Sequence, residues 1–165
     1  MSAARHVLFE AGGLALAVPA DAVQAIHDDL PVQRVEGTRG WFLGLAVADG
    51  RLLPVTDLGA WLGVRASGGR TLQLHADVGI AGFRVDVVYG LSDADAGVPA
   101  AASEASERRR ETGRRADGGG PTPRGGADGV LTPMTIVEDG RQHRVVDLAG
   151  LLQSPEFLDI AAADA

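Results

Sequence analysis

The residues best suited to chemistry are two aspartates that recur in the same short motif. Asp57 precedes Leu-Gly-Ala-Trp-Leu and Asp147 precedes Leu-Ala-Gly-Leu-Leu. Two such carboxylates would form a general acid–base pair if the fold brought them together. Each also stands directly before an apolar helical turn, where an aspartate accepts hydrogen bonds from free backbone N–H groups. We therefore predict that both aspartates cap short helices, and we expect no catalytic residue.

Other catalytic and metal-binding chemistries lack the residues that they need. The chain has no Cys, and all 15 of its basic residues are Arg, which excludes disulfides, thiolate metal sites, cysteine nucleophiles and lysine Schiff bases. The four histidines show no metal-ligand spacing, and no serine stands in a G-x-S-x-G motif. We expect neither a metal nor a cofactor. A formal net charge of -7 argues against a general nucleic-acid binder.

A segment with few large apolar residues interrupts the chain. Residues 97–127 contain an Ala-rich patch, the sequence EASERRRETGRR and a run rich in Gly and Pro. Such a segment buries too little apolar surface to offset its ordering entropy, so we predict a flexible insertion. An alternative function rests on its Arg-rich part, residues 104–124, which would contact nucleic acid or another acidic partner. Six Arg stand there against four acids and no aromatic residue is interleaved, which favours a solvated loop.

The rest of the chain has the pattern of short β-strands joined by tight turns. The predicted strand pairs are 7–10 with 14–18, 45–47 with 52–55 across an Asp-Gly turn, and 71–76 with 80–91. No apolar stretch approaches the ~18 residues of a membrane span, and no signal peptide is recognisable. We therefore expect a cytoplasmic protein that does not insert into a membrane.

The motif around the two aspartates is part of a longer repeat. Asp49-Gly50-Arg51 recurs as Asp139-Gly140-Arg141, and both copies read D-G-R-x3-V-x-D-L-x2-[WL]-L at an offset of 90 residues. We predict two similar β units that share a core, one over residues 5–64 and one over residues 70–152 with the insertion inside it. Small units of about five strands close most easily as SH3-like barrels. The sequence thus predicts one all-β domain over 1–165, made of two packed SH3-like five-stranded barrels with short helices, and a C-terminal helix over 154–163.

The order of several motifs resembles the CheW-like adaptor family of bacterial chemosensory systems. In chain order these are the strand pair 9–19, VQAI at 23–26, WFLGL at 41–45, PVTDL at 54–58, VDVVYGLSD at 85–93 and DLAGLL at 147–152. The resemblance extends over nearly the whole chain except the insertion. It implies two intertwined barrels without enzymatic activity. The implied partners are the regulatory domain of a CheA-type histidine kinase, contacted through barrel loops, and a methyl-accepting chemoreceptor, contacted through a groove between the barrels.

The resemblance also implies contact residues, matched here by position. The residues carried over are Val23, Ala25, Leu43, Gly44 and Asp49, and Trp41 and Arg51 complete the predicted partner-binding residues. Trp41 is included because three consecutive bulky residues cannot all face one barrel interior, so at least one of residues 41–43 should be exposed or lie between the units. Asp49 stands where the family commonly has Arg, and Leu43 where Lys or Arg is common. These departures favour a specialised adaptor, such as one in a type IV pilus twitching pathway.

These observations lead to one main hypothesis. The protein is a non-enzymatic scaffold that couples a CheA-type histidine kinase to chemoreceptors in chemotaxis or twitching motility. We expect it to be a monomer in isolation and to have no nucleic-acid partner.

Overall fold

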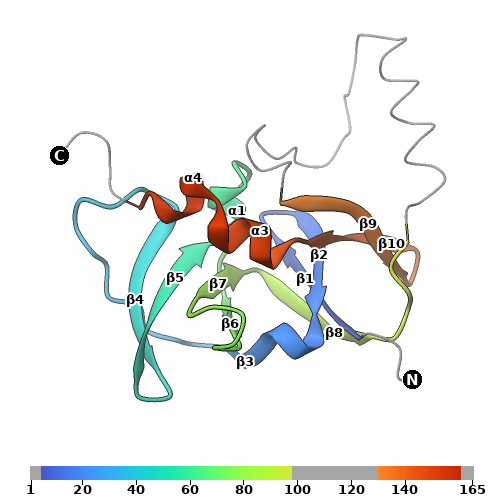
Figure 1. The fold of residues 1–165 in the computed structure, drawn as a ribbon, viewed down its shortest axis with the longest axis horizontal. Helices are drawn as coiled ribbons and strands as arrows, with labels where there is room; N and C mark the ends of the chain where they lie inside the picture. Colours follow the sequence, from blue (N-terminus) through green and yellow to red (C-terminus); the bar gives the residue numbers. More distant parts are fainter. Residues whose placement is uncertain (1–4, 98–129, 161–165) are drawn as a thin grey trace, which may run out of the picture.

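Two five-stranded sheets organise the computed structural model (Figure 1). Sheet A has the order β8 (Val87–Ser92), β1 (His6–Ala11), β2 (Leu14–Pro19), β10 (Arg141–Val146) and β9 (Leu131–Glu138). Sheet B has the order β3 (Val23–His27), β6 (Arg70–Leu74), β7 (Gly82–Val85), β5 (Arg51–Asp57) and β4 (Phe42–Ala48). The structure describes residues 5–97 and 130–160; the predicted insertion, apart from Gly97, and its Arg-rich part 104–124 lie outside the described residues.

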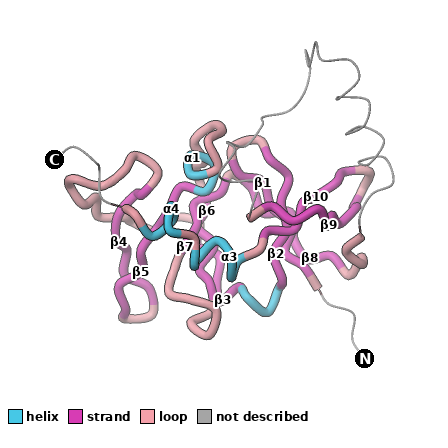
Figure 2. The backbone as a smooth tube through the Cα atoms, turned by 45° about the horizontal axis from the view of Figure 1, so that its top comes forward, coloured by secondary structure: helices cyan, strands magenta, loops and turns pink. Residues whose placement is uncertain are grey.

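Short helices connect and cover the sheets. They are the 3-10 helix Ala20–Ala22, α1 (Leu58–Trp61), α3 (Leu148–Gln153) and α4 (Pro155–Leu158). Figures 1 and 2 show α3 and α4 following β10 and leading from sheet A across to sheet B. Among the described residues, none of the helices has the length and apolar character that crossing a membrane requires.

The two halves of the chain exchange their first hairpins. The β1–β2 hairpin pairs with β8 and, in parallel, with β10 from the second half, whereas the β6–β7 hairpin pairs with β3 and, in parallel, with β5 from the first half. The sheets therefore do not correspond to the consecutive segments 5–64 and 70–152 that we predicted. Local sequence patterns define a hairpin, but they do not determine which strand its free edge will meet. The intertwined arrangement is the one that the family resemblance implied.

The five strands predicted for each unit are present, but main-chain pairing closes neither sheet into a barrel within the described residues. Strands β8 and β9 are the edges of sheet A, and β3 and β4 are the edges of sheet B. Side chains bridge the edges instead. In sheet A, the Ser92 hydroxyl bonds to the Glu138 carboxylate, which joins β8 to β9.

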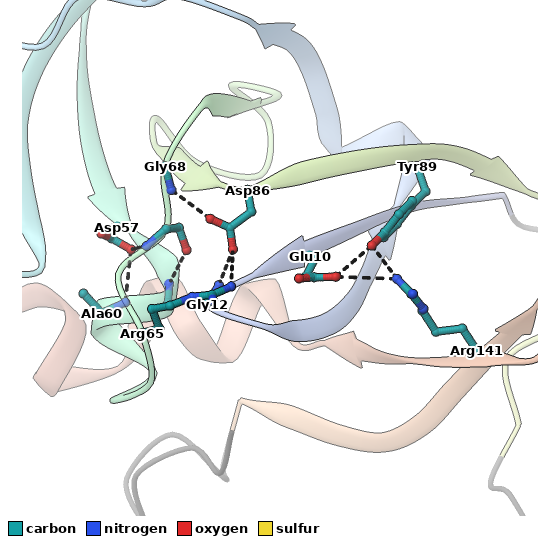
Figure 3. A network of polar contacts seen from close by, with 11 residues as sticks. Glu10, Gly12, Asp57, Ala60, Arg65, Gly68, Asp86, Tyr89 and Arg141 are labelled. Atoms are coloured by element: carbon teal, nitrogen blue, oxygen red, sulfur yellow. Dashed lines mark hydrogen bonds and ion pairs between the residues drawn. The ribbon is translucent and has the colours of Figure 1, made fainter. Parts of the chain in front are cut away.

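One predicted strand is two strands in the structure. The run 80–91 breaks at Asp86, because β7 belongs to sheet B and β8 to sheet A. The Asp86 carboxylate accepts hydrogen bonds from the backbone N–H groups of Gly12 at 2.8 Å and Gly68 at 2.9 Å, as Figure 3 shows. Asp86 therefore fixes the point at which the chain crosses between the sheets. Sequence reasoning missed this role, because both partners are distant in the chain.

The repeat around the two aspartates is confirmed in detail. Asp49 and Asp139 have φ values of 52° and 51°, so both Asp-Gly pairs form the tight turns that we predicted. Asp57 caps α1 and Asp147 caps α3, each accepting a backbone N–H bond at 3.1 Å. The two carboxylates serve separate helices, which corrects any reading of them as an acid–base pair.

Both faces of the central strands are buried, which explains their unbroken apolar runs. In β1, Val7 and Phe9 face a core shared by the two sheets, and Leu8 faces a smaller cluster with Ile136 inside sheet A. Inside sheet B, the corresponding cluster includes Leu53. The shared core that the sequence predicted is therefore flanked by one small interior cluster in each sheet.

Candidate partner-binding surface

The tip of the β4–β5 hairpin presents an exposed apolar pair. Val47 and Leu52 lie opposite each other in the antiparallel register and are 65% and 62% exposed. The turn between them, Asp49-Gly50, has positive φ at both residues, which makes it a tight two-residue turn. Asp49 and Arg51 are exposed at the same tip. A rigid tip with two aliphatic side chains and one charge of each sign is suited to recognition by a protein.

A cavity of about 300 Å³ opens beside this tip. We call it the hairpin cavity; its lining includes Gln24, Asp49, Arg51, Leu52, Gln73 and Ile80. Gln73 is only 9% exposed, and its Nε2 donates to Asp49 Oδ2 at 3.3 Å. Gln73 Oε1 is also bonded to His27 Nε2 at 2.8 Å. The cavity thus combines an aliphatic wall with an ordered amide, a carboxylate and a guanidinium.

A second hollow lies between sheet B and the C-terminal helices. This apolar groove has a volume of about 390 Å³ and is lined by residues that include Phe42, Leu45, Pro54, Ile80, Leu152 and Leu158. Leu158 is 63% exposed and Ile80 is 57% exposed. Large aliphatic side chains around an open groove form a surface that a helix or loop of another protein can cover.

Helix α4 forms one wall of the groove because an aromatic cluster anchors it. Phe157 stacks on Trp41 with ring centroids 6.0 Å apart and meets the edges of Trp61 at 5.9 Å. Beyond the helix, Arg39 donates its backbone N–H to the Ile160 carbonyl and its Nε to the Asp159 carbonyl, both at 2.7 Å. The helix predicted over 154–163 therefore ends at Leu158, because these bonds hold the next residues outside it; residues after 160 are outside the described range.

The structure brings some of the predicted contact residues together. Asp49 and Arg51 line the hairpin cavity. Val23 and Ala25 lie half-buried on β3, the edge strand that contributes Gln24 to the same cavity. Leu43 is half-buried and packs against the interior cluster of sheet B, away from the aromatic cluster.

Two predicted contact residues are buried in the structure. Trp41 is buried under Phe157, a neighbour 116 positions away that no local pattern indicates. Gly44 is buried with a φ of 135°, and a Cβ there would lie 2.0 Å from the Gln33 carbonyl oxygen. That close approach allows Leu45 N–H to donate to the same carbonyl at 2.9 Å. Trp41 thus contributes to the core shared by the two sheets, and Gly44 allows the close approach of residue 33 to β4.

Sequence reasoning missed a polar cluster on sheet A. The Tyr89 hydroxyl donates to Glu10 Oε2 at 2.7 Å, and the Arg141 guanidinium lies over the Tyr89 ring, 5.1 Å from its centroid (Figure 3). The hydrogen bond to Glu10, followed by burial, raises the pKa of Tyr89 above its usual value of 10.0. The cluster ties β8 to β1 and β10. The repeat of Arg51 as Arg141 singled out the arginine of this cluster, but no sequence pattern indicated a role for Tyr89.

Comparisons with known proteins agree with this architecture. Residues 5–111 match the CheW-like domain. The fold is similar to the crystal structure of the scaffolding protein TtCheW from Thermoanaerobacter tengcongensis, with a TM-score of 0.63 and 15% identity over 93% of this chain and 95% of that chain. No curated protein matches the chain in sequence. The family match covers more than half of the chain, so this protein belongs to the CheW-like domain family of chemotaxis scaffold proteins, as its motifs predicted.

Proposed function

We propose that this protein is a non-enzymatic cytoplasmic scaffold that holds a CheA-type histidine kinase next to a methyl-accepting chemoreceptor. The observation that carries the proposal is the exposed pair Val47 and Leu52 on a rigid tip beside a partly polar cavity. Family membership supports the scaffold role. The titratable groups best suited to catalysis are used structurally, because Asp57 and Asp86 accept backbone hydrogen bonds.

The kinase regulatory domain is assigned to the hairpin tip. Val47 and Leu52 supply apolar contact area, and Asp49 and Arg51 supply one charge of each sign at the rim. Apolar anchors surrounded by polar groups are the usual composition of a transient protein interface. Asp49 reverses the charge that the family commonly carries here, which supports a partner with a matching reversal, such as the kinase of a type IV pilus twitching pathway.

The chemoreceptor is assigned to the apolar groove. Its walls come from sheet B on one side and from α3 and α4, which follow sheet A, on the other. A groove of this kind fits the apolar face of a receptor helix. Because the two surfaces are separate except for Ile80, which lines both, one scaffold can hold both partners at once.

A titration with the isolated regulatory domain of the cognate kinase tests the first assignment. We expect binding to the full chain, and we expect Leu52→Gln to weaken it by about 30-fold, the effect of losing an anchor worth about 2 kcal/mol. Leu52→Gln gives the tip the residue that the second hairpin carries at Gln142. Gln142→Ala is the matched control and should leave the Kd unchanged. No detectable binding by the wild type would overturn the kinase assignment.

A coiled-coil fragment of the receptor signalling tip tests the second assignment. Leu158→Asp places a charge in the apolar groove and should weaken receptor binding at least tenfold, because an unpaired charge would be buried on association. Leu91→Asp, at a 60% exposed position on β8, is the control and should have no effect. Equal losses in both variants would contradict the assignment. Sedimentation equilibrium of the isolated chain should show the monomer that we propose.

A further inference from the structure

The two sheets are copies, and their pairing registers identify equivalent positions. Val55 and Val145 are 90 residues apart in the repeat. In sheet B, cross-strand pairing connects Val55 to Gly82, Gly82 to Gln73, and Gln73 to Ala25. In sheet A, it connects Val145 to Ala17, Ala17 to Leu8, and Leu8 to Gly90. Ala25 on β3 therefore occupies the place of Gly90 on β8. It follows that Gln24, one residue earlier, occupies the place of Tyr89.

A bulge at the same place in both sheets confirms this equivalence. The register of β3 against β6 shifts between Val23 and Ala25, so Gln24 is the additional residue. The register of β8 against β1 shifts in the same way, and there the additional residue is Tyr89. Bulges commonly redirect a side chain. In each sheet the additional residue lies near the arginine of the D-G-R motif: Tyr89 lies under Arg141, and Gln24 lines the same cavity as Arg51.

The surroundings of these two side chains differ. In sheet A, the Tyr89 ring lies under the Arg141 guanidinium, and its hydroxyl bonds to the Glu10 carboxylate. In sheet B, Gln24 and Arg51 line the hairpin cavity, with the Asp49 carboxylate on the same lining. Sheet B thus has the equivalent guanidinium beside an open cavity, and its carboxylate comes from Asp49 in the turn rather than from the position equivalent to Glu10.

We propose that the hairpin cavity receives an aromatic side chain, preferably tyrosine, from the protein partner that binds this tip. Arg51 would lie over the ring as Arg141 does over Tyr89, and Asp49 would accept the phenolic hydrogen bond. A volume of about 300 Å³ is at the lower limit of small-molecule sites, so it suits one side chain. This inference rests on the proposed function, because it names the part of the kinase regulatory domain that enters the cavity.

The first test uses p-cresol, the side-chain analogue of tyrosine, and the full chain. In NMR titrations we expect amide shifts at Asp49, Arg51 and Gln73 with a Kd that is roughly millimolar. The saturated analogue 4-methylcyclohexanol, which has no π face, should bind several-fold more weakly. Gln24→Tyr should abolish the p-cresol shifts, because its own ring would lie under Arg51 as Tyr89 lies under Arg141 in sheet A. Tyr89→Gln, the matched control, should retain them.

The second test measures the regulatory domain against the same variants. Gln24→Tyr should weaken its binding at least tenfold, whereas Tyr89→Gln should leave it within twofold, ratios of the size that loss or retention of one anchor gives. If Gln24→Tyr binds the domain like the wild type, or if p-cresol produces no shifts, the inference is overturned and the scaffold proposal stands. If the wild type does not bind the domain at all, the scaffold proposal fails, and the p-cresol shifts alone decide whether the cavity selects aromatic rings.

Discussion

The two hairpins that carry the D-G-R motif share a backbone but have different surroundings. Their turns have φ values within 3° of each other, and the aspartates that follow them cap helices at the same 3.1 Å. Yet the exposed partner of Val47 is Leu52, whereas the exposed partner of Val137 is Gln142. The first hairpin stands beside an open cavity, and the second contributes its arginine to a filled cluster. The comparison shows that the two copies share a backbone and differ in the side chains at each tip, and we propose that these side chains decide which copy binds a partner.

The largest expected difference between the two copies concerns a glycine. Gly44 has a φ of 135° and no room for a Cβ beside Gln33. The corresponding bridge in sheet A joins Thr135 to Gly97, so Gly97 stands in the place of Gln33 rather than of Gly44, and it has open space around it. We expect Gly44→Ala to lower the free energy of unfolding by about 3 kcal/mol or more, from strain and a backbone clash. Gly97→Ala should change it by less than about 0.5 kcal/mol. Urea unfolding followed by circular dichroism measures both, and equal losses would show that the two bridges are alike.

The two helix caps should differ less in how much each contributes to the free energy of unfolding. Asp57 is 4% exposed and accepts a second hydrogen bond, from Ser67 N–H at 2.8 Å, whereas Asp147 is exposed and accepts its capping bond from Gly150 N–H. Asp57→Ala should cost about 2–3 kcal/mol of unfolding free energy, because it removes a cap and leaves a buried N–H unpaired. Asp147→Ala should cost about 0.5–1 kcal/mol, the effect of an exposed cap. Asp57→Asn retains the acceptor oxygen and should recover most of the loss; similar values for the two alanine variants would contradict this account.

The smallest expected difference concerns one buried position inside each sheet and its effect on how stability depends on pH. His143 stands in sheet A where Leu53 stands in sheet B, and burial lowers the pKa of His143 below its usual 6.5. Below pH 6.5, His143 becomes protonated more readily in the unfolded chain than in the folded chain. Its contribution to stability is therefore present above pH 6.5 and is lost as the pH falls. Thermal unfolding midpoints should therefore decline on acidification, and His143→Leu should flatten that decline. An unchanged pH profile in the variant would contradict the assignment.

Much of this molecule was predictable from local patterns. The offset between Asp49 and Asp139 predicted the paired hairpins, and the apolar turn after Asp57 predicted its capping role. Both depend on residues that are close in sequence, where turn and cap geometry is specific. The ordered motifs predicted the family that the sequence comparison then matched.

The features that were missed depend on contacts between distant residues. Local patterns did not predict the exchange of hairpins, which only the family resemblance implied, because the apolar residues of β1 and β6 fit either sheet. Trp41 was predicted as a contact residue because its cover, Phe157, comes from the other end of the chain. Tyr89 lies within the motif at 85–93, but its role emerges only when the bulges of the two sheets are aligned.

The central claim is that the first hairpin binds the partner and the second does not. The most direct measurement is isothermal titration of the kinase regulatory domain into Val47→Asp and Val137→Asp, two variants with the same change at equivalent positions that are 65% and 52% exposed. We predict that Val47→Asp raises the Kd by about 30-fold or more, as loss of a central anchor does, and that Val137→Asp leaves it within twofold. Equal effects, or a larger loss in Val137→Asp, would contradict the claim.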